Sequence, residues 1–294
     1  MPLDPEIAAY LEAQKSLPPR SGLTLEQTRA RMVDSARING GAPLAIAHVN
    51  DLVLPGGVPV RDYQASPDQD VPLLLYFHGG RFISGDLASH DPLCRRLAVA
   101  ANCRLVAVNY RLAPEHPFPA AIDDSLAAVD WAVSQSKQVS VAGDSAGANI
   151  AAVVAAERRS KVHCQVLIYP MIDATRSLPS HVELGEGWGP SSLDMKRGWD
   201  EYVPAGMDVR DPRVSPLFAT DLEGLPPALV LTAEYDSLRD EGETYASNLG
   251  QAGNRVELTR CLGTIHGFIT LTGISRMARE TVADIAAYLR RTLL

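Results

Sequence analysis

The clearest chemical signal in this 294-residue sequence is the motif Gly143-Asp144-Ser145-Ala146-Gly147. A β-prone run over 138–142 precedes it, and an alanine-rich segment with high helix propensity follows. Glycines on both sides of Ser145 suit a sharp strand-to-helix turn, at which a serine adopts a strained backbone conformation and projects above the sheet. A serine that only caps the helix is the simpler alternative. The strand before the motif and the helix after it favour a nucleophile.

A base and an acid for Ser145 follow later in the chain, each after a predicted strand. A serine hydroxyl is a weak nucleophile, so a base must accept its proton, and His266 follows a predicted strand over 256–261. Asp236 follows a predicted strand over 228–233 and would orient the imidazole. Asp240 is the alternative acid, but a negative charge in the first turn of a helix explains it equally well.

Backbone donors for a developing oxyanion are predicted at two turns. A run without alternation over 71–77 predicts a strand covered on both faces, and it ends in His78-Gly79-Gly80-Arg81. Glycines directly after such a strand let N–H groups turn toward a ligand. We therefore assign the oxyanion hole to Gly79, Gly80, Arg81 and Ala146.

The elements that must position these groups alternate between strand and helix. This alternation with short links predicts an α/β fold, in which a mostly parallel central sheet is flanked by helices and ligands bind at the carboxyl ends of the strands. Two helical segments within 1–40 precede the first strand, and a Pro-Gly-Gly turn within 45–63 predicts an antiparallel hairpin at a sheet edge. The expected organisation is a cap segment over 1–42, core over 43–170, a second cap segment over 171–225, and core again over 226–294.

The substrate pocket is expected to draw mainly on the 171–225 insertion, which interrupts the alternation. Its apolar residues are candidates to line an acyl or alcohol pocket, although a helix stripe packed on the core explains some of them equally well. The full set assigned to substrate binding is Phe82, Asp144, Trp188, Leu193, Met195, Trp199 and Ile265. The proline-rich connection 110–120 is expected to buttress the site, and its His116 to be structural.

Composition excludes several classes of function. The net charge of −8 and the absence of a basic block argue against nucleic acid and against an anionic membrane as partners. Four scattered cysteines without a C-x-x-C motif indicate buried thiols in a reducing compartment. With no apolar signal segment and no apolar run long enough for a bilayer, the expected location is the cytoplasm. The seven histidines are dispersed and no H-E-x-x-H occurs, so neither a metal nor a cofactor is expected.

Taken together, these motifs resemble the hormone-sensitive-lipase family of bacterial esterases, which has the α/β-hydrolase fold with a helical cap. The resemblance extends from about residue 70 to the C-terminus, and the order Ser145, Asp236, His266 is that of an α/β-hydrolase triad. The motifs that carry it are His78-Gly79-Gly80, Tyr110-Arg111-Leu112-Ala113-Pro114-Glu115, residues 143–147, Asp236-x-Leu238-x-Asp240-Glu241 and His266-Gly267-Phe268. It implies a carboxylesterase for short acyl chains. Arg81 departs from the family's third glycine; it keeps the N–H, so the oxyanion hole is retained if the backbone there avoids positive φ.

The leading hypothesis is hydrolysis of small-molecule carboxylic esters through an acyl-enzyme. An arylformamidase or amidase with the same triad is an alternative, and a ligand receptor on a disabled hydrolase scaffold is another. Fold-level analogy alone suggests a homodimer.

Overall fold

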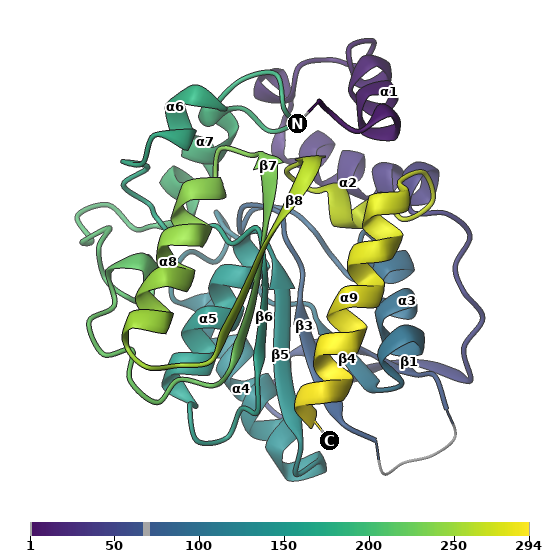
Figure 1. Cartoon of the computed structure of the whole chain (residues 1–294), viewed down its shortest axis with the longest axis vertical. Helices are drawn as coiled ribbons and strands as arrows, with labels where there is room; N and C mark the ends of the chain where they lie inside the picture. Colours follow the sequence, from purple (N-terminus) through teal and green to yellow (C-terminus); the bar gives the residue numbers. More distant parts are fainter. Residues whose placement is uncertain (1, 67–70, 294) are drawn as a thin grey trace.

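The computed structural model describes residues 2–66 and 71–293. Residue 1 of the expected first cap segment, residues 67–70 of the first core segment and residue 294 of the last segment lie outside the described residues. Helices of this described part surround one central sheet (Figure 1).

The sheet contains eight strands in the order β1-β2-β4-β3-β5-β6-β7-β8 within the described residues. The strands are β1 His48–Val53, β2 Pro59–Gln64, β3 Leu73–Phe77, β4 Arg104–Val108, β5 Val139–Asp144, β6 Gln165–Ile168, β7 Ala228–Tyr235 and β8 Val256–Ile265. β1 pairs antiparallel with β2, and β2 with β4, whereas all the other pairs are parallel. The predicted edge hairpin and the mostly parallel sheet are both confirmed.

Strand β3 illustrates why this sheet has a core on each face. All five of its residues are buried, which agrees with an apolar run that has no polar alternation. Because successive side chains of a strand point to opposite faces, Leu73 and Leu75 join one apolar cluster while Leu74 and Tyr76 join the other. Helices must therefore cover both faces of the sheet.

Helices cover those two faces and the end of the sheet where the parallel strands terminate (Figure 1). One face is covered by α3 Asp91–Ala101 and α9 Arg276–Leu293; the other by α4 Ala120–Gln135, α5 Ala146–Glu157 and α8 Arg239–Gln251. Above the carboxyl ends of the strands lie α1 Pro5–Gln14, α2 Leu25–Asn39, α6 Ser180–Glu183 and α7 Ser192–Tyr202. The short 3-10 helices are η1 Arg20–Gly22, η2 Pro216–Phe218 and η3 Phe268–Thr270.

The last two strands are longer than the sequence pattern predicted. The apolar runs predicted ends at Ala233 and Cys261, but β7 continues to Tyr235 and β8 to Ile265. The pairing of β7 with β8 has a register irregularity between Ala233 and Tyr235. A pattern of apolar residues in the sequence does not reveal such a bulge. As a result Asp236 and His266 follow their strands directly.

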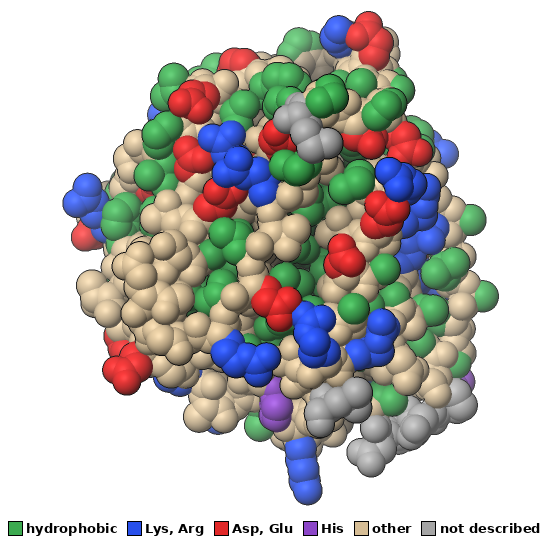
Figure 2. Space-filling view, viewed as in Figure 1, with side chains coloured by type: hydrophobic (Ala, Val, Ile, Leu, Met, Phe, Trp, Pro, Cys, Tyr) green, Lys and Arg blue, Asp and Glu red, His purple; other side chains and the backbone are tan. Residues whose placement is uncertain are grey.

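The surface mixes charges of both signs. Figure 2 shows acidic and basic side chains interspersed with hydrophobic ones over the face seen in Figure 1, without a field of one sign. All four cysteines are buried free thiols. Of the helices in the described part of the chain, none has the length and apolar character to cross a bilayer.

Candidate active site

Ser145 sits at a tight turn between β5 and α5. Its backbone has φ 55° and ψ −120°, a conformation that costs a non-glycine residue about 1–3 kcal/mol. The Ser145 N–H donates to the Ile168 carbonyl at 2.9 Å, which ties the turn to β6. A Cβ at Gly147 would lie 1.9 Å from the Phe77 carbonyl oxygen, so only glycine lets α5 approach β3 this closely. The strand, turn and helix predicted around Ser145 are all present.

Ser145, His266 and Asp236 form a hydrogen-bonded chain across three strand ends. His266 Nε2 lies 3.0 Å from Ser145 Oγ, and His266 Nδ1 lies 2.8 Å from Asp236 Oδ2. The other Asp236 oxygen, Oδ1, accepts the Leu238 N–H at 2.9 Å, which holds the carboxylate in place. Asp240 is instead bound to the N–H of Ser180 and to Arg239. The three predicted residues are therefore hydrogen-bonded to one another, and the alternative acid, Asp240, is not part of this chain.

The turn after β3 presents backbone donors beside Ser145. Within the described residues, the N–H groups of Gly80 and Arg81 have no hydrogen-bond acceptor, whereas the Gly79 N–H donates to Asp144 Oδ1 at 2.9 Å. Gly79 was assigned to the oxyanion hole, but its N–H is already used to anchor the turn. Gly80, Arg81 and the first N–H of α5, at Ala146, are the groups of the predicted set that fit a bound oxyanion.

Arg81 adopts the left-handed conformation, although retention of the oxyanion hole was expected to need a backbone without positive φ here. Its φ is 59°, and the next residue, Phe82, has φ 63°. Each costs on the order of 1–2 kcal/mol for an L-residue. The N–H of Arg81 is retained all the same, so positive φ makes this turn costly without removing the donor.

Asp144 holds the turn after β3 beside Ser145 through several hydrogen bonds. Besides the Gly79 N–H, its Oδ1 accepts the Tyr76 hydroxyl at 2.8 Å and lies 3.2 Å from His90 Nε2. Tyr169 donates to its Oδ2 at 3.5 Å. Burial alone would raise the pKa of Asp144, but His90 and the hydrogen bonds from Tyr76 and Gly79 lower it overall. Asp144 is therefore an ionised anchor.

The proline-rich connection does buttress the site. Tyr110 donates its hydroxyl to the His78 carbonyl at 2.6 Å, and its ring stacks on the His78 ring at 4.3 Å. Burial lowers the pKa of His78 to about 4, so this imidazole is neutral. His116 is exposed and is not among the residues that line the cavity above Ser145.

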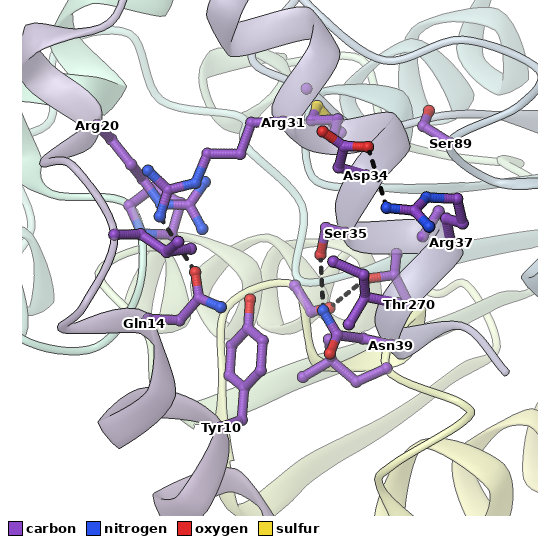
Figure 3. A pocket seen from close by; sticks show the side chains of 18 of the residues that line it. Tyr10, Gln14, Arg20, Arg31, Asp34, Ser35, Arg37, Asn39, Ser89 and Thr270 are labelled. Atoms are coloured by element: carbon purple, nitrogen blue, oxygen red, sulfur yellow. Dashed lines mark hydrogen bonds and ion pairs between the residues drawn. The ribbon is translucent and has the colours of Figure 1, made fainter.

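A cavity of about 870 Å³ opens above Ser145 and His266 (Figure 3). Its walls come mainly from α1, η1 and α2, and Figure 3 shows Tyr10, Gln14, Arg31 and Ser35 among these side chains. The two N-terminal helices are predicted as part of the cap, but the predicted lining residues include none of theirs. The mixture of polar and apolar residues along α2 is the sequence feature that could have indicated its lining role.

Most residues assigned to the pocket lie elsewhere. Of that set, Asp144 alone is among the described residues that line this cavity. Phe82 is fully buried, with its ring stacked on Tyr202 at 3.7 Å. Met195 and Trp199 belong to the inner face of α7, which packs on the core. The alternative of a helix stripe packed on the core is therefore correct for these two residues.

The three remaining residues of the set also lie away from this cavity, each in a different environment. Leu193 lies on the outer side of α7 and is 64% exposed. Trp188 stacks on Tyr235 at 4.5 Å, and Ile265 is buried in the core layer that α3 and α9 cover. An insertion's apolar composition does not say which of its faces meets the cavity.

A separate buried group joins α6 to α8. Oxygen and nitrogen atoms of Asp173, His181 and Glu241 lie within 4.8 Å of one another. His181 Nε2 is 2.7 Å from Glu241 Oε2, and Glu241 Oε1 accepts the Ile172 N–H at 2.6 Å. Asp173 accepts hydrogen bonds from Thr175 and Ser177. These internal bonds explain the cluster as a structural link, and the absence of a metal stays a prediction.

The fold and the strand-end arrangement of serine, histidine and aspartate define the α/β-hydrolase class. In agreement, a family model described as the alpha/beta hydrolase fold matches residues 74–270. The chain belongs to this family.

Comparison with individual relatives indicates which α/β hydrolases this chain is most similar to in kind. A carboxylic ester hydrolase of Mycobacterium tuberculosis, LipN, is 37% identical, covering 92% of this chain and 85% of the relative. An ethyl acetate hydrolase of Pseudomonas putida is 35% identical over the full length of both chains. The solved hyperthermophilic esterase of Pyrobaculum calidifontis superposes with a TM-score of 0.93 at 38% identity, covering 99% of each chain. The expected resemblance to hormone-sensitive-lipase-like carboxylesterases is confirmed.

Proposed function

We propose that this protein is a serine carboxylesterase that hydrolyses short-chain carboxylic esters through an acyl-enzyme. The relatives support the general class, carboxylic ester hydrolase. The observation that carries the finer proposal is the hydrogen-bonded chain from Ser145 Oγ through His266 to Asp236 at the floor of a cavity.

In the proposed mechanism, Ser145 Oγ attacks the ester carbonyl carbon while His266 Nε2 takes the hydroxyl proton. The resulting oxyanion is stabilised by the N–H groups of Gly80, Arg81 and Ala146. Collapse of this intermediate breaks the ester C–O bond, and the leaving alcohol receives the proton from Nε2. Water then attacks the acyl-enzyme and gives a proton to His266; the bond between the acyl carbon and Ser145 Oγ breaks, Oγ takes the proton back from His266, and the acid leaves. Asp236 holds Nδ1–H and stabilises the imidazolium in each half-reaction.

We also propose that residues 1–42 and the insertion 171–225 are the two segments of the cap of this site. Arg29 of α2 fastens the first segment to the core: it donates to the Ile83 carbonyl at 2.9 Å and pairs with Glu115 at 2.7 Å. Because α1 and α2 also line the cavity, the N-terminal segment can contact a ligand held above Ser145.

The test is hydrolysis of p-nitrophenyl butyrate by wild type and by Ser145→Ala. Removing the nucleophile should lower kcat on the order of 10⁶-fold while circular dichroism and the unfolding midpoint stay near wild type. Ser134→Ala, at an exposed position of α4, is the control and should keep full activity. Substantial remaining turnover in Ser145→Ala would exclude this serine as the nucleophile.

A substrate panel separates the alternatives that keep the same scaffold. Faster cleavage of N-formyl anilines or p-nitroanilides than of p-nitrophenyl esters would indicate an arylformamidase or amidase. Saturable binding without turnover of any ester or amide would indicate a receptor. The proposal expects ester hydrolysis to be fastest.

A further inference from the structure

One end of the cavity above Ser145 concentrates positive charge. Arg20 of η1, Arg31 of α2 and Arg81 of the oxyanion turn all line this cavity. Figure 3 shows the guanidinium groups of Arg20 and Arg31 pointing toward one another, beside Gln14 and Tyr10. Burial is the main cause of the lowered pKa of Arg31 and of Arg81, and the charge of Arg20 adds to the lowering in both. The three cations therefore line the same cavity and lie near enough to influence one another's charge.

Protein carboxylates compensate these cations only in part. Among the residues that the structure describes, neither Arg20 nor Arg31 has an ion pair, and Arg31 donates only to the neutral oxygens of Pro18 and Gln14. Arg81 is buried, and its nearest counter-charge, Asp194 Oδ1, is 3.6 Å away. Burial lowers the pKa of Arg81 to about 10, so it remains charged at neutral pH.

Asp194 is itself engaged in another role. Its Oδ2 accepts the N–H of Ser191 at 2.8 Å and the Ser191 hydroxyl at 3.0 Å, as the capping partner at the start of α7. Asp194 thus already caps a helix, and Glu201, the other carboxylate whose charge acts on Arg81, is paired with Arg197 at 2.7 Å. A buried cation with an incomplete partner gains from an added anion.

At the opposite end of the cavity, the positive and negative charges of the side chains offset one another. Asp34 pairs with Arg37 at 3.7 Å, and both side chains are largely exposed. Glu6 accepts the N–H of Arg276. Figure 3 shows the Asp34–Arg37 pair on the other side of the cavity from Arg20 and Arg31. The excess of positive charge is therefore confined to one end.

We propose that the cavity selects esters that carry a carboxylate, which Arg20, Arg31 and Arg81 bind while Ser145 attacks the ester carbonyl. A guanidinium binds a carboxylate with two parallel hydrogen bonds, and among the described residues neither Arg20 nor Arg31 is already paired with one. The inference rests on the proposed esterase function and adds to it a substrate class: half-esters of dicarboxylic acids, or esters of hydroxy acids.

Matched esters test this selectivity. Monomethyl adipate carries a terminal carboxylate on its acyl side that methyl hexanoate lacks. Likewise, 6-acetoxyhexanoate carries one on its alcohol side that hexyl acetate lacks. In a pH-stat at low ionic strength, kcat/KM for the anion should exceed that for its neutral partner by roughly tenfold or more in at least one pair. The advantage should shrink as salt is added. Preference for the neutral ester in both pairs would overturn the inference.

Arginine variants locate the selectivity. Arg20→Gln/Arg31→Gln should lower the anionic-to-neutral ratio roughly tenfold, and Arg31→Glu should lower it further. Arg31→Gln alone should also lower the ratio, and Arg37→Gln is its matched control, because each removes one positive charge from α2. Arg37→Gln should leave the ratio within about twofold. An equal loss of the ratio in Arg37→Gln would assign the effect to net charge and contradict the proposed site.

Binding separates this inference from the proposed function. Calorimetry on Ser145→Ala, which cannot turn over substrate, should show tighter binding of monomethyl adipate than of methyl hexanoate, with the difference lost in the double arginine variant. If the wild type hydrolyses no ester, the proposed function fails, and calorimetry still decides the anion site. If it hydrolyses neutral esters and Ser145→Ala binds both ligands equally, only this inference fails.

Discussion

At the scale of single residues, Ser145 keeps a costly backbone conformation because its neighbours fix both sides of the turn. Its N–H is held by Ile168 and its carbonyl accepts the Met171 N–H at 3.1 Å. Strain of about 1–3 kcal/mol is maintained by such contacts when surrounding structure determines the geometry. The hydroxyl is thereby presented to His266 before substrate binds.

Asp144→Asn tests how the oxyanion turn is positioned. An amide offers one acceptor oxygen where the carboxylate has two, and its NH₂ would face donors such as the Tyr169 hydroxyl. We expect kcat to fall at least tenfold with little change in KM, because the donors are displaced while the cavity is intact. Loss of buried hydrogen bonds should also lower the free energy of unfolding by about 1–3 kcal/mol.

Steady-state kinetics with p-nitrophenyl butyrate and urea unfolding measure these two effects. Asp123→Asn, at an exposed position of α4, is the control and should match wild type in both. A normal kcat in Asp144→Asn would mean that the turn keeps its place without this anchor.

At the scale of elements, the approach of α5 to β3 depends on a single missing side chain. In Gly147→Ala the new Cβ would collide with the Phe77 carbonyl, so strand or helix must shift, and we expect more than about 3 kcal/mol of destabilisation or failure to fold. Gly250 of α8 has open space around its Cβ position, so Gly250→Ala should stabilise the protein by about 0.5–1 kcal/mol. Urea denaturation compares the two variants; equal stability would show that the contact yields easily.

Among the elements, those that depend on local sequence signals could be predicted from the sequence. The Ser145 turn and the edge hairpin are encoded by local signals, which are the spacing of glycines and a turn between β-prone runs. The pocket was not predictable in this way. Whether Trp199 faces a cavity or the core depends on how α7 packs against distant segments. The network on Asp144 likewise joins residues from four separate segments, of which the motif names one.

At the scale of the whole molecule, the buried His181–Glu241 pair makes stability depend on pH. Burial raises the pKa of Glu241 to about 7, whereas an unfolded glutamate ionises near 4.5. Burial alone would lower the pKa of His181, but its hydrogen bond to Glu241 outweighs this and raises it above 6.5. The folded state therefore holds protons more tightly than the unfolded state at both sites, so their contribution to stability is lost as pH rises.

Thermal unfolding between pH 5 and pH 8 checks this sign. We expect the midpoint of wild type to fall more across this range than that of Glu241→Gln, which lacks the titrating carboxyl. Parallel profiles for the two proteins would show that the pair does not couple folding to protonation.

The homodimer suggested by fold analogy stays a prediction at this scale, as does the cytoplasmic location. Neither affects the proposed chemistry, because every group assigned to the reaction comes from one chain.

The most direct test of the central claim is covalent labelling by diethyl p-nitrophenyl phosphate, followed by mass spectrometry of the intact protein and its peptides. The account predicts one diethylphosphoryl group, located on Ser145, together with loss of ester hydrolysis and no adduct on Ser145→Ala. A label on another residue, or full ester hydrolysis in a protein labelled at Ser145, would contradict it.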